Sequence, residues 1–456
     1  MSNGFDAAAL ARQALAFCEG DAHVTVTHER SLLSRFARSR PTQATDVDDT
    51  DVDILCLADG VPGWATTNGL DEDALRECAR RARASAEAAA RLGTEEPMSL
   101  APPAAYRTHD GWDAETAQLD ARVAGEALAT IFEVVETGGL EAFGVWTAGE
   151  VTTAIATSAG VTAVDRVTDA AVKVVARDDE GRSGWGAGAG SAIGDLDPVD
   201  VAVRALAAAP RDPALSLEPG EYPVVLAPDA VGELLEFLGQ TALNGLLHAE
   251  GRGALSGALG TRVAAPSINL ADSPRYIRTL PRAFDADGTP KAPIALIQDG
   301  IANAVVHDRR SAARAGDGAV STGHAIAPGG APSGPHATNL VLGGGGASGI
   351  AELCKPIERG LFVTRLWYVN VVDGRRSLLT GTTRDGTYMI ENGRVSRPVK
   401  DVRFTDSVLR ILSATEALTA TQRLVCDLQF YRRRFASGVV CPALRAHSFR
   451  VTGQTV

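Results

Sequence analysis

Turn dipeptides in the second half of the chain set the strongest limit on what this sequence can fold into. Each one pairs Asp or Asn with Gly between runs in which apolar and polar residues alternate: Asp287-Gly288, Asp299-Gly300, Asp373-Gly374, Asp385-Gly386 and Asn392-Gly393. Such pairs supply the positive φ angles that tight hairpin turns require, and alternation is typical of strands. The second half is therefore predicted to be a hairpin-rich antiparallel β domain.

The first half repeats a different theme, a helix followed by antiparallel strands. Apolar spacing predicts helices at residues 6–18, 71–92, 114–135 and 198–208. Short strands are expected at 23–27 and 31–36, and three or four more between 141 and 175, whereas the acidic residues 46–53 are interpreted as a turn-rich stretch. The fold class is therefore predicted to be α+β.

Prolines mark the boundary between the two halves. Pro210, Pro213 and Pro219 lie within ten residues of one another, which is typical of a linker. We predict an N-terminal α+β domain at 1–210 and a C-terminal β-rich domain at 221–456. The second domain should begin with a strand at 222–226 and a helix at about 229–247.

Charge and composition exclude several classes of protein. The 44 basic and 56 acidic residues give a net charge of −12, and no basic run exceeds three residues, which argues against binding to nucleic acid. No apolar run approaches the ~18 residues of a membrane helix, and residues 1–20 do not resemble an export signal. The six cysteines form no Cys-x-x-Cys pair. We therefore expect a cytoplasmic protein with reduced thiols that does not contact a membrane.

The usual catalytic motifs are missing. The single His-Glu dipeptide, His28-Glu29, has Leu32 and Leu33 where a zinc peptidase helix would carry its second histidine. The glycine-rich run at 344–349 matches a dinucleotide-binding pattern, but its short helix and its hairpin surroundings favour a plain loop. A metal site assembled from His307, His324 and His336 stays open as an alternative.

The second half resembles the TldD/PmbA family of peptidase-like proteins, and most closely its TldE (PmbA) branch. The resemblance lies in residues 311–314 (SAAR), 321–325 (STGHA), 339–342 (NLVL), 361–367 (LFVTRLW) and 385–393 (DGTYMIENG). It covers the chain from about residue 222 onward. In that family the TldD subunit carries His-Glu-x-x-x-His on a helix after the linker, with a downstream Cys that completes a zinc site, and TldE lacks these ligands.

The resemblance implies a degenerate zinc site in this chain. In its register the motif positions are Glu236, Phe237 and Thr241, and Ala436 stands about where the Cys would fall. Cys441 lies several residues away and is expected to pack in the core. Without two imidazoles a single carboxylate cannot hold Zn²⁺ tightly enough to acidify its water. No cofactor is therefore expected in this chain.

The function that this resemblance implies is that of a non-catalytic, TldE-like subunit. It would form a heterodimer with a TldD-like zinc peptidase subunit and act on unfolded or short peptides. The alternatives are a peptidase in its own right, with a metal at His307, His324 and His336, and a stand-alone peptide-binding or scaffolding protein. His324 and Trp367 are further candidates for cleft or interface residues. The sequence leaves open the peptide substrate, the pathway, the partner's identity and any homodimer.

Overall fold

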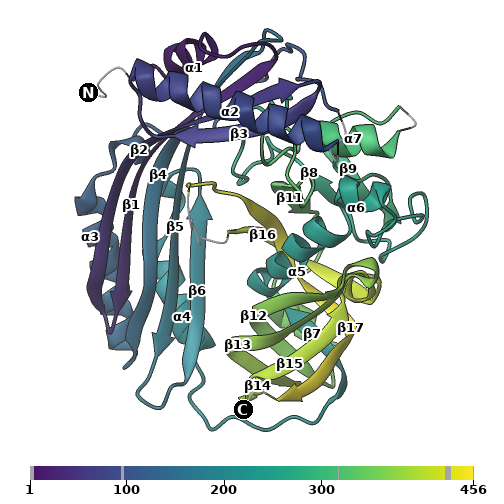
Figure 1. The fold of residues 1–456 in the computed structure, drawn as a ribbon. Coiled ribbons are helices and arrows are strands. Elements are labelled where there is room, and N and C mark those ends of the chain that lie inside the picture. The colour runs from purple at the N-terminus through teal and green to yellow at the C-terminus, as the bar shows by residue number, and fades with distance from the viewer. Residues whose placement is uncertain (1–4, 94–96, 317, 427–432, 455–456) are drawn as a thin grey trace.

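The structure is a computed structural model, and it describes residues 5–93, 97–316, 318–426 and 433–454. Two sheets face each other across a central space (Figure 1). The strands of the first sheet lie before Pro210, and those of the second lie after residue 219. The α+β class is confirmed. No helix in the described ranges is long and apolar enough to cross a lipid bilayer.

The first sheet has six antiparallel strands in the order β3-β2-β1-β4-β5-β6. Their bounds are β1 Ala22–Ala37, β2 Arg40–Ala58, β3 Val61–Thr67, β4 Glu141–Thr157, β5 Thr162–Arg177 and β6 Ser183–Gly190. Several of these strands are longer than expected from the sequence. The runs at 23–27 and 31–36 form one strand, and the runs between 141 and 175 form only β4 and β5.

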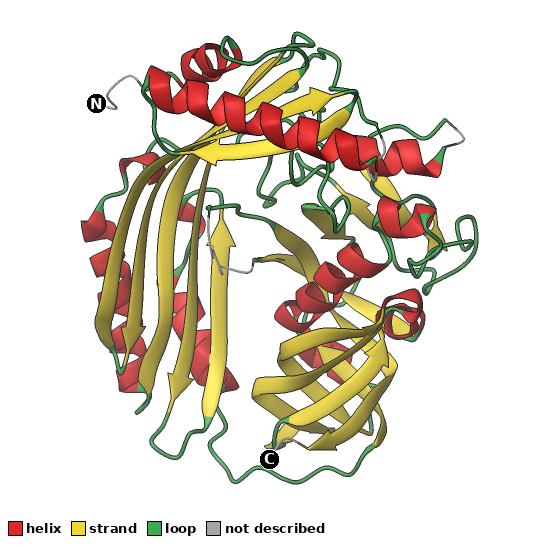
Figure 2. Ribbon diagram, viewed as in Figure 1, coloured by secondary structure: helices red, strands yellow, loops and turns green. Residues whose placement is uncertain are grey.

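Helices cover only the outer face of this sheet (Figure 2). They are α1 Ala7–Leu15, α2 Glu72–Leu92, α3 Ala121–Thr137 and α4 Pro198–Ala208, with short 3₁₀ turns η1 Thr116–Gln118 and η2 Ile193–Asp195. One apolar core joins α1 and α2 to β1 and β2, and a second joins α3 and α4 to β4 and β5. The inner face is left for the second half of the chain.

The acidic residues 46–53, expected as a turn, lie inside β2. Side chains of a strand alternate between its two faces. Val52 and Ile54 are therefore buried under the helices, whereas Asp51 and Asp53 point to the inner face. The expectation is wrong because these acidic residues alternate with the β-branched residues Val and Thr, a pattern that favours a strand over a turn.

The second sheet contains eleven strands among the described residues. They are β7 Gly220–Leu226, β8 Leu270–Asp272, β9 Ile294–Gln298, β10 Ile301–Ala302, β11 Asn339–Leu342, β12 Arg359–Asp373, β13 Leu378–Glu391, β14 Arg394–Pro398, β15 Val402–Ser407, β16 Thr415–Val425 and β17 Gly438–Gln454. Most pairings are antiparallel, as predicted, but β11 with β17 and β12 with β7 are parallel. Because β7 pairs with both β12 and β17, the path β17-β15-β13-β12-β7 closes on itself.

Short helices fill the second half. They are α5 Pro228–Thr241, α6 Gly245–Ala249, α7 Arg309–Ala315, α8 Ile350–Cys354 and α9 Val408–Ser413, with a 3₁₀ turn η3 Gly374–Arg376. The single helix expected at 229–247 is split into α5 and α6, because Asn244 caps the second helix with its side-chain oxygen. Asp385-Gly386, expected as a hairpin turn, lies within β13.

Edge strand β6 has glycine at alternate positions because α4 packs directly on that face. A Cβ atom at Gly184 would lie 2.1 Å from the carbonyl oxygen of Ala205, and one at Gly186 would lie 2.0 Å from that of Val201. Such approaches are too close for any side chain. The alternating glycines of β6 therefore set the distance between helix and sheet.

Replacing Gly184 with Ala should destabilise the protein by about 1–3 kcal/mol, since the new methyl group must push α4 off the sheet. The matched control is Gly125→Ala in α3, where a Cβ would meet nothing within 4 Å. That change should stabilise by about 0.5–1 kcal/mol through helix propensity. Denaturation midpoints in urea measure both variants, and a Gly184→Ala protein as stable as the parent would contradict this account of the packing.

Candidate functional site

A cavity of about 950 Å³ lies between the inner face of the first sheet and the second half of the chain. Alternate residues of three strands form one wall, with Thr25 and Thr27 of β1, Asp51 of β2, and Val151 and Thr153 of β4 among them. Loops of the second half form the other wall, and they contribute Arg282, Asp285, Lys291, His324 and His336. The two halves of the chain therefore share one candidate site.

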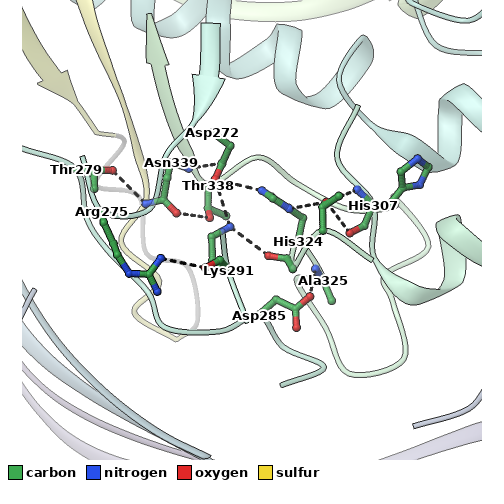
Figure 3. Close-up of polar contacts among 12 residues, drawn as sticks. Asp272, Arg275, Thr279, Asp285, Lys291, His307, His324, Ala325, Thr338 and Asn339 are labelled. Carbon is green, nitrogen blue, oxygen red and sulfur yellow. Dashed lines mark hydrogen bonds and ion pairs between the residues drawn. The ribbon is translucent and has the colours of Figure 1, made fainter. Parts of the chain in front are cut away.

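A buried charge network forms the floor of the cavity (Figure 3). The Oδ1 atom of Asp272, at the end of β8, lies 3.2 Å from His324 Nε2 and 3.6 Å from Lys291 Nζ. Its Oδ2 atom accepts a hydrogen bond of 2.8 Å from the backbone N–H of Asn339. Lys291 also donates to the carbonyl oxygen of Gly323 at 3.3 Å. One carboxylate thus organises two neighbouring basic side chains and the start of β11.

Burial and charge act in opposite directions on this network. Burial favours the neutral form of Asp272, but the charges of Lys291 and His324 outweigh it and hold the pKa of this carboxyl well below its usual range. Burial lowers the pKa values of Lys291 and of His324. The Nδ1 atom of His324 lies 2.9 Å from the hydroxyl of Thr322.

Two further carboxyls lie in the turn at Asp285 and Asp287, and that of Asp285 lines the cavity. Asp285 accepts backbone hydrogen bonds from Asp287, Thr289 and Ala325. Asp287 accepts one of 2.7 Å from the backbone N–H of Gly329, and its other oxygen has no hydrogen-bond partner among the residues that the structure describes. Burial raises the pKa of both carboxyls, and for Asp287 the negative charge of Asp285 raises it further.

Two arginines from the segment before β17 reach across to the first sheet. The Nε atom of Arg434 lies 2.6 Å from Asp169 Oδ2, and its Nη1 atom donates to Thr147 at 2.9 Å. Arg433 pairs with Asp51 at 2.6 Å and also with Asp53. The side chains of Arg434 and Asp169 are almost wholly buried. These contacts fasten the second half of the chain to the acidic inner wall.

Comparison with known proteins places this architecture in a family. The model of the PmbA/TldA metallopeptidase C-terminal domain matches residues 219–453, more than half of the chain, and the model of domain 1 matches residues 23–86. The chain belongs to the PmbA/TldD family. Its mixed α+β fold agrees with the solved structure of TldE from Thermococcus kodakarensis, at a TM-score of 0.83 and 18% identity over 98% of this chain and 99% of that one.

Curated relatives of this PmbA/TldD protein match only about half of the chain. A metalloprotease from Methanothermobacter thermautotrophicus is 26% identical over 224 residues, which cover 49% of this chain and 47% of that protein. A metalloprotease from Synechocystis is 27% identical over 232 residues, covering 49% and 48%. The chain spans about half the length of the curated relatives that it matches.

The positions of the expected zinc motif are engaged in other contacts. Glu236 accepts a hydrogen bond of 2.9 Å from His336 Nε2. Burial opposes protonation of His336, but its bond to Glu236 outweighs this and raises its pKa. Phe237 packs against the apolar core, and the hydroxyl of Thr241 donates to the carbonyl oxygen of Phe237 within the same helix.

The downstream candidates also serve structural roles. Ala436 is buried, and its carbonyl oxygen accepts a hydrogen bond of 3.0 Å from Arg282. Cys441 lies inside β17, where its thiol lies 3.3 Å from the carbonyl oxygen of Pro228, and burial raises its pKa well above the usual value. Glu236, Phe237, Thr241 and Ala436 therefore do not fit a zinc ion as a set.

The histidines of the alternative metal site lie in one region but point to different partners. His307 lies 3.2 Å from the hydroxyl of Ser311, His324 faces Asp272, and His336 is bonded to Glu236. The described ranges contain no group of three or more His, Cys, Asp or Glu side chains that could hold a metal ion. The structure does not bring these three together as ligands.

The two cleft or interface candidates lie in different places. His324 is in the cavity wall. Trp367 is 38% exposed on β12, where the guanidinium of Arg365 lies 4.8 Å from its ring centroid, and it does not line the cavity.

Sequence reasoning missed most of the cavity floor, including Asp272, Asp285 and Lys291. One signal was available, because Lys291 is one of only four lysines in a chain with 44 basic residues. No such signal marks Asp272 or Asp285.

Replacing Asp287 with Asn should change how stability depends on pH. A carboxyl whose pKa is raised in the folded state keeps its proton where the unfolded chain, with a pKa of about 3.9, has lost it. Stability therefore falls as pH rises above about 4. Asn cannot ionise, so the variant loses no stability in this way. Its free energy of unfolding should therefore rise relative to that of the parent as pH increases, by ~1.4 kcal/mol for each pKa unit by which folding raises the pKa of Asp287.

Urea denaturation at a series of pH values checks this expectation. The series runs from about 4, near the usual pKa of Asp, to about 8. The control is Asp299→Asn, an exposed carboxyl for which no such gain is expected. Parallel pH profiles for the Asp287→Asn protein and its parent would show that Asp287 is ionised throughout.

Proposed function

We propose that this chain is the TldE-like, non-catalytic subunit of a TldD/TldE zinc peptidase that acts on unfolded or short peptides. Family membership supports the peptidase context. The observation that carries the subunit role is the contact between Glu236 and His336. This contact occupies Glu236, the one potential metal ligand among the motif positions on α5. In the related catalytic subunit, the corresponding helix is expected to carry the metal.

The remaining motif positions support the same proposal. Phe237 has no atom that can bind a metal ion, and Thr241 uses its hydroxyl within the helix. Zinc in a peptidase needs two or more imidazole or carboxylate ligands and an open position for water. The metal-activated water would therefore come from a TldD-like partner, which would form a heterodimer with this chain. We place this complex in the cytoplasm.

The contribution of this chain would be to enclose and hold the peptide. Its cavity of about 950 Å³ lies between two sheets and suits a short or unfolded segment better than a folded domain. The polar wall of the first sheet and the charged floor of the second half can both contact such a segment. A folded substrate would be excluded by the size of the space.

Isolated protein should contain no stoichiometric zinc, and peptide cleavage should appear only when the TldD-like subunit of the same organism is added. Elemental analysis of the purified chain and a fluorogenic peptide assay of the reconstituted pair measure the two expectations. Zinc at one ion per chain would contradict the proposal. Glu236→Ala and His336→Ala variants would then report whether that metal is held at α5.

A further inference from the structure

Arg282 is a cation in the cavity wall that has no acidic partner among the described residues. Its Nη2 atom donates to the carbonyl oxygen of Ala436 at 3.0 Å, and its guanidinium stacks 3.7 Å from the centroid of the Phe435 ring. Its Nε atom is buried, and no described residue forms a hydrogen bond with it. In the part of the chain that the structure describes, no carboxylate oxygen lies within 4.0 Å of the nitrogen atoms of Arg282, which is the limit for an ion pair. Arg282 therefore differs from Arg433 and Arg434 on the same cavity.

The acids whose charges act on Arg282, Asp165 and Asp169, are already bound elsewhere. The two oxygens of Asp165 accept hydrogen bonds of 2.8 Å from His109 and from the backbone N–H of Ala283. Asp169 accepts hydrogen bonds from Nε and Nη2 of Arg434. These carboxylates act on Arg282 only over a distance, and burial, the largest influence, lowers its pKa.

A guanidinium remains charged in proteins and carries five N–H donors. The described contacts use one of those five. Keeping such a cation partly desolvated without an anion costs free energy. A ligand with a negative charge would offset that cost. Lys291 brings a second positive charge close to Arg282. Burial lowers the pKa of Lys291 most, and the positive charge of Arg282 lowers it further.

We propose that Arg282, supported by Lys291, binds a carboxylate group of a peptide in the cavity. Guanidinium groups match the planar geometry of carboxylates. Phe284, Phe435 and Ile326 also line the cavity and offer apolar contacts for the side chain beside that carboxylate. The identity of the ligand as a peptide rests on the proposed function, whereas the need for an anion rests on the unpaired charge alone.

Binding of defined tripeptides to the full isolated chain tests this site, with affinity measured by calorimetry. N-acetyl-Ala-Ala-Leu is compared with its C-terminal amide and with the amide of N-acetyl-Glu-Ala-Leu, so that the probes differ in whether and where they carry a carboxylate. A probe with a carboxylate should bind at least ~10-fold more tightly than the uncharged amide. The free acid and the Glu probe distinguish a C-terminal carboxylate from a side-chain one.

Substitutions of Arg282 test whether this residue causes the preference for a carboxylate. In Arg282→Gln the preference for a carboxylate should fall to about onefold, and in Arg282→Lys it should be reduced but retained, because charge remains without the planar fork. Arg394→Gln, an exposed change on β14 that does not line the cavity, should keep the full preference. Circular dichroism and thermal midpoints check that each variant is folded.

A measurement on the parent protein covers the case in which Arg282→Gln does not fold. The carboxylate preference should shrink as salt is raised from about 0.01 M to 1 M, since charge contacts are screened. Equal binding of all three probes, no binding up to millimolar concentration, or a preference that survives in folded Arg282→Gln would overturn the proposal. None of these results would bear on whether cleavage requires the partner subunit.

Discussion

Carboxylates on the inner face of the first sheet are the constraint on which the rest of the structure depends. A two-layer fold ordinarily buries an apolar face there, but β1, β2 and β5 turn Glu29, Asp51, Asp53 and Asp169 inward. A buried carboxylate needs a cation or several hydrogen bonds. Arg433 and Arg434 supply both. The inner face of the first sheet is therefore joined to the second half of the chain by charge pairing across the cavity and not by a continuous apolar interface.

The same requirement explains why the cavity remains between the two halves. The large apolar cores lie on the helix side of the first sheet and around α5 in the second half, and only a small apolar cluster, with Ile155 and Phe284, joins the two halves. The charged surfaces that meet between them cannot pack into a dry core, because each charge needs directional partners. On the floor, Asp272 meets this need with Lys291, His324 and the backbone of Asn339. A polar chamber is thus the natural product of two well-packed halves.

Much of this fold, but little of its site, could be predicted from the sequence. Helix α4 was located at its full bounds, and the turns at Asp299 and Asn392 separate paired strands, because short-range propensity decides such features. The acidic part of β2 was missed, since its partner Arg433 lies almost four hundred residues away. Glu236 was selected through a family resemblance, yet its bond to His336 depends on the tertiary fold. Asp272 and Arg282 have no local pattern, because their roles arise from loops that meet only in three dimensions.

The closed path of strands in the second half bears on how the chain can fold. Strand β17 pairs with β7, although Phe449 and its partner Tyr222 are separated by more than two hundred residues. Such long-range pairing gives a high contact order, which slows folding. During synthesis the helix-covered first sheet can form early, whereas the ring of strands has to wait for β17 to emerge from the ribosome. Until then one edge of β7 lacks its neighbour, and the nascent protein is at that stage most exposed to misassociation.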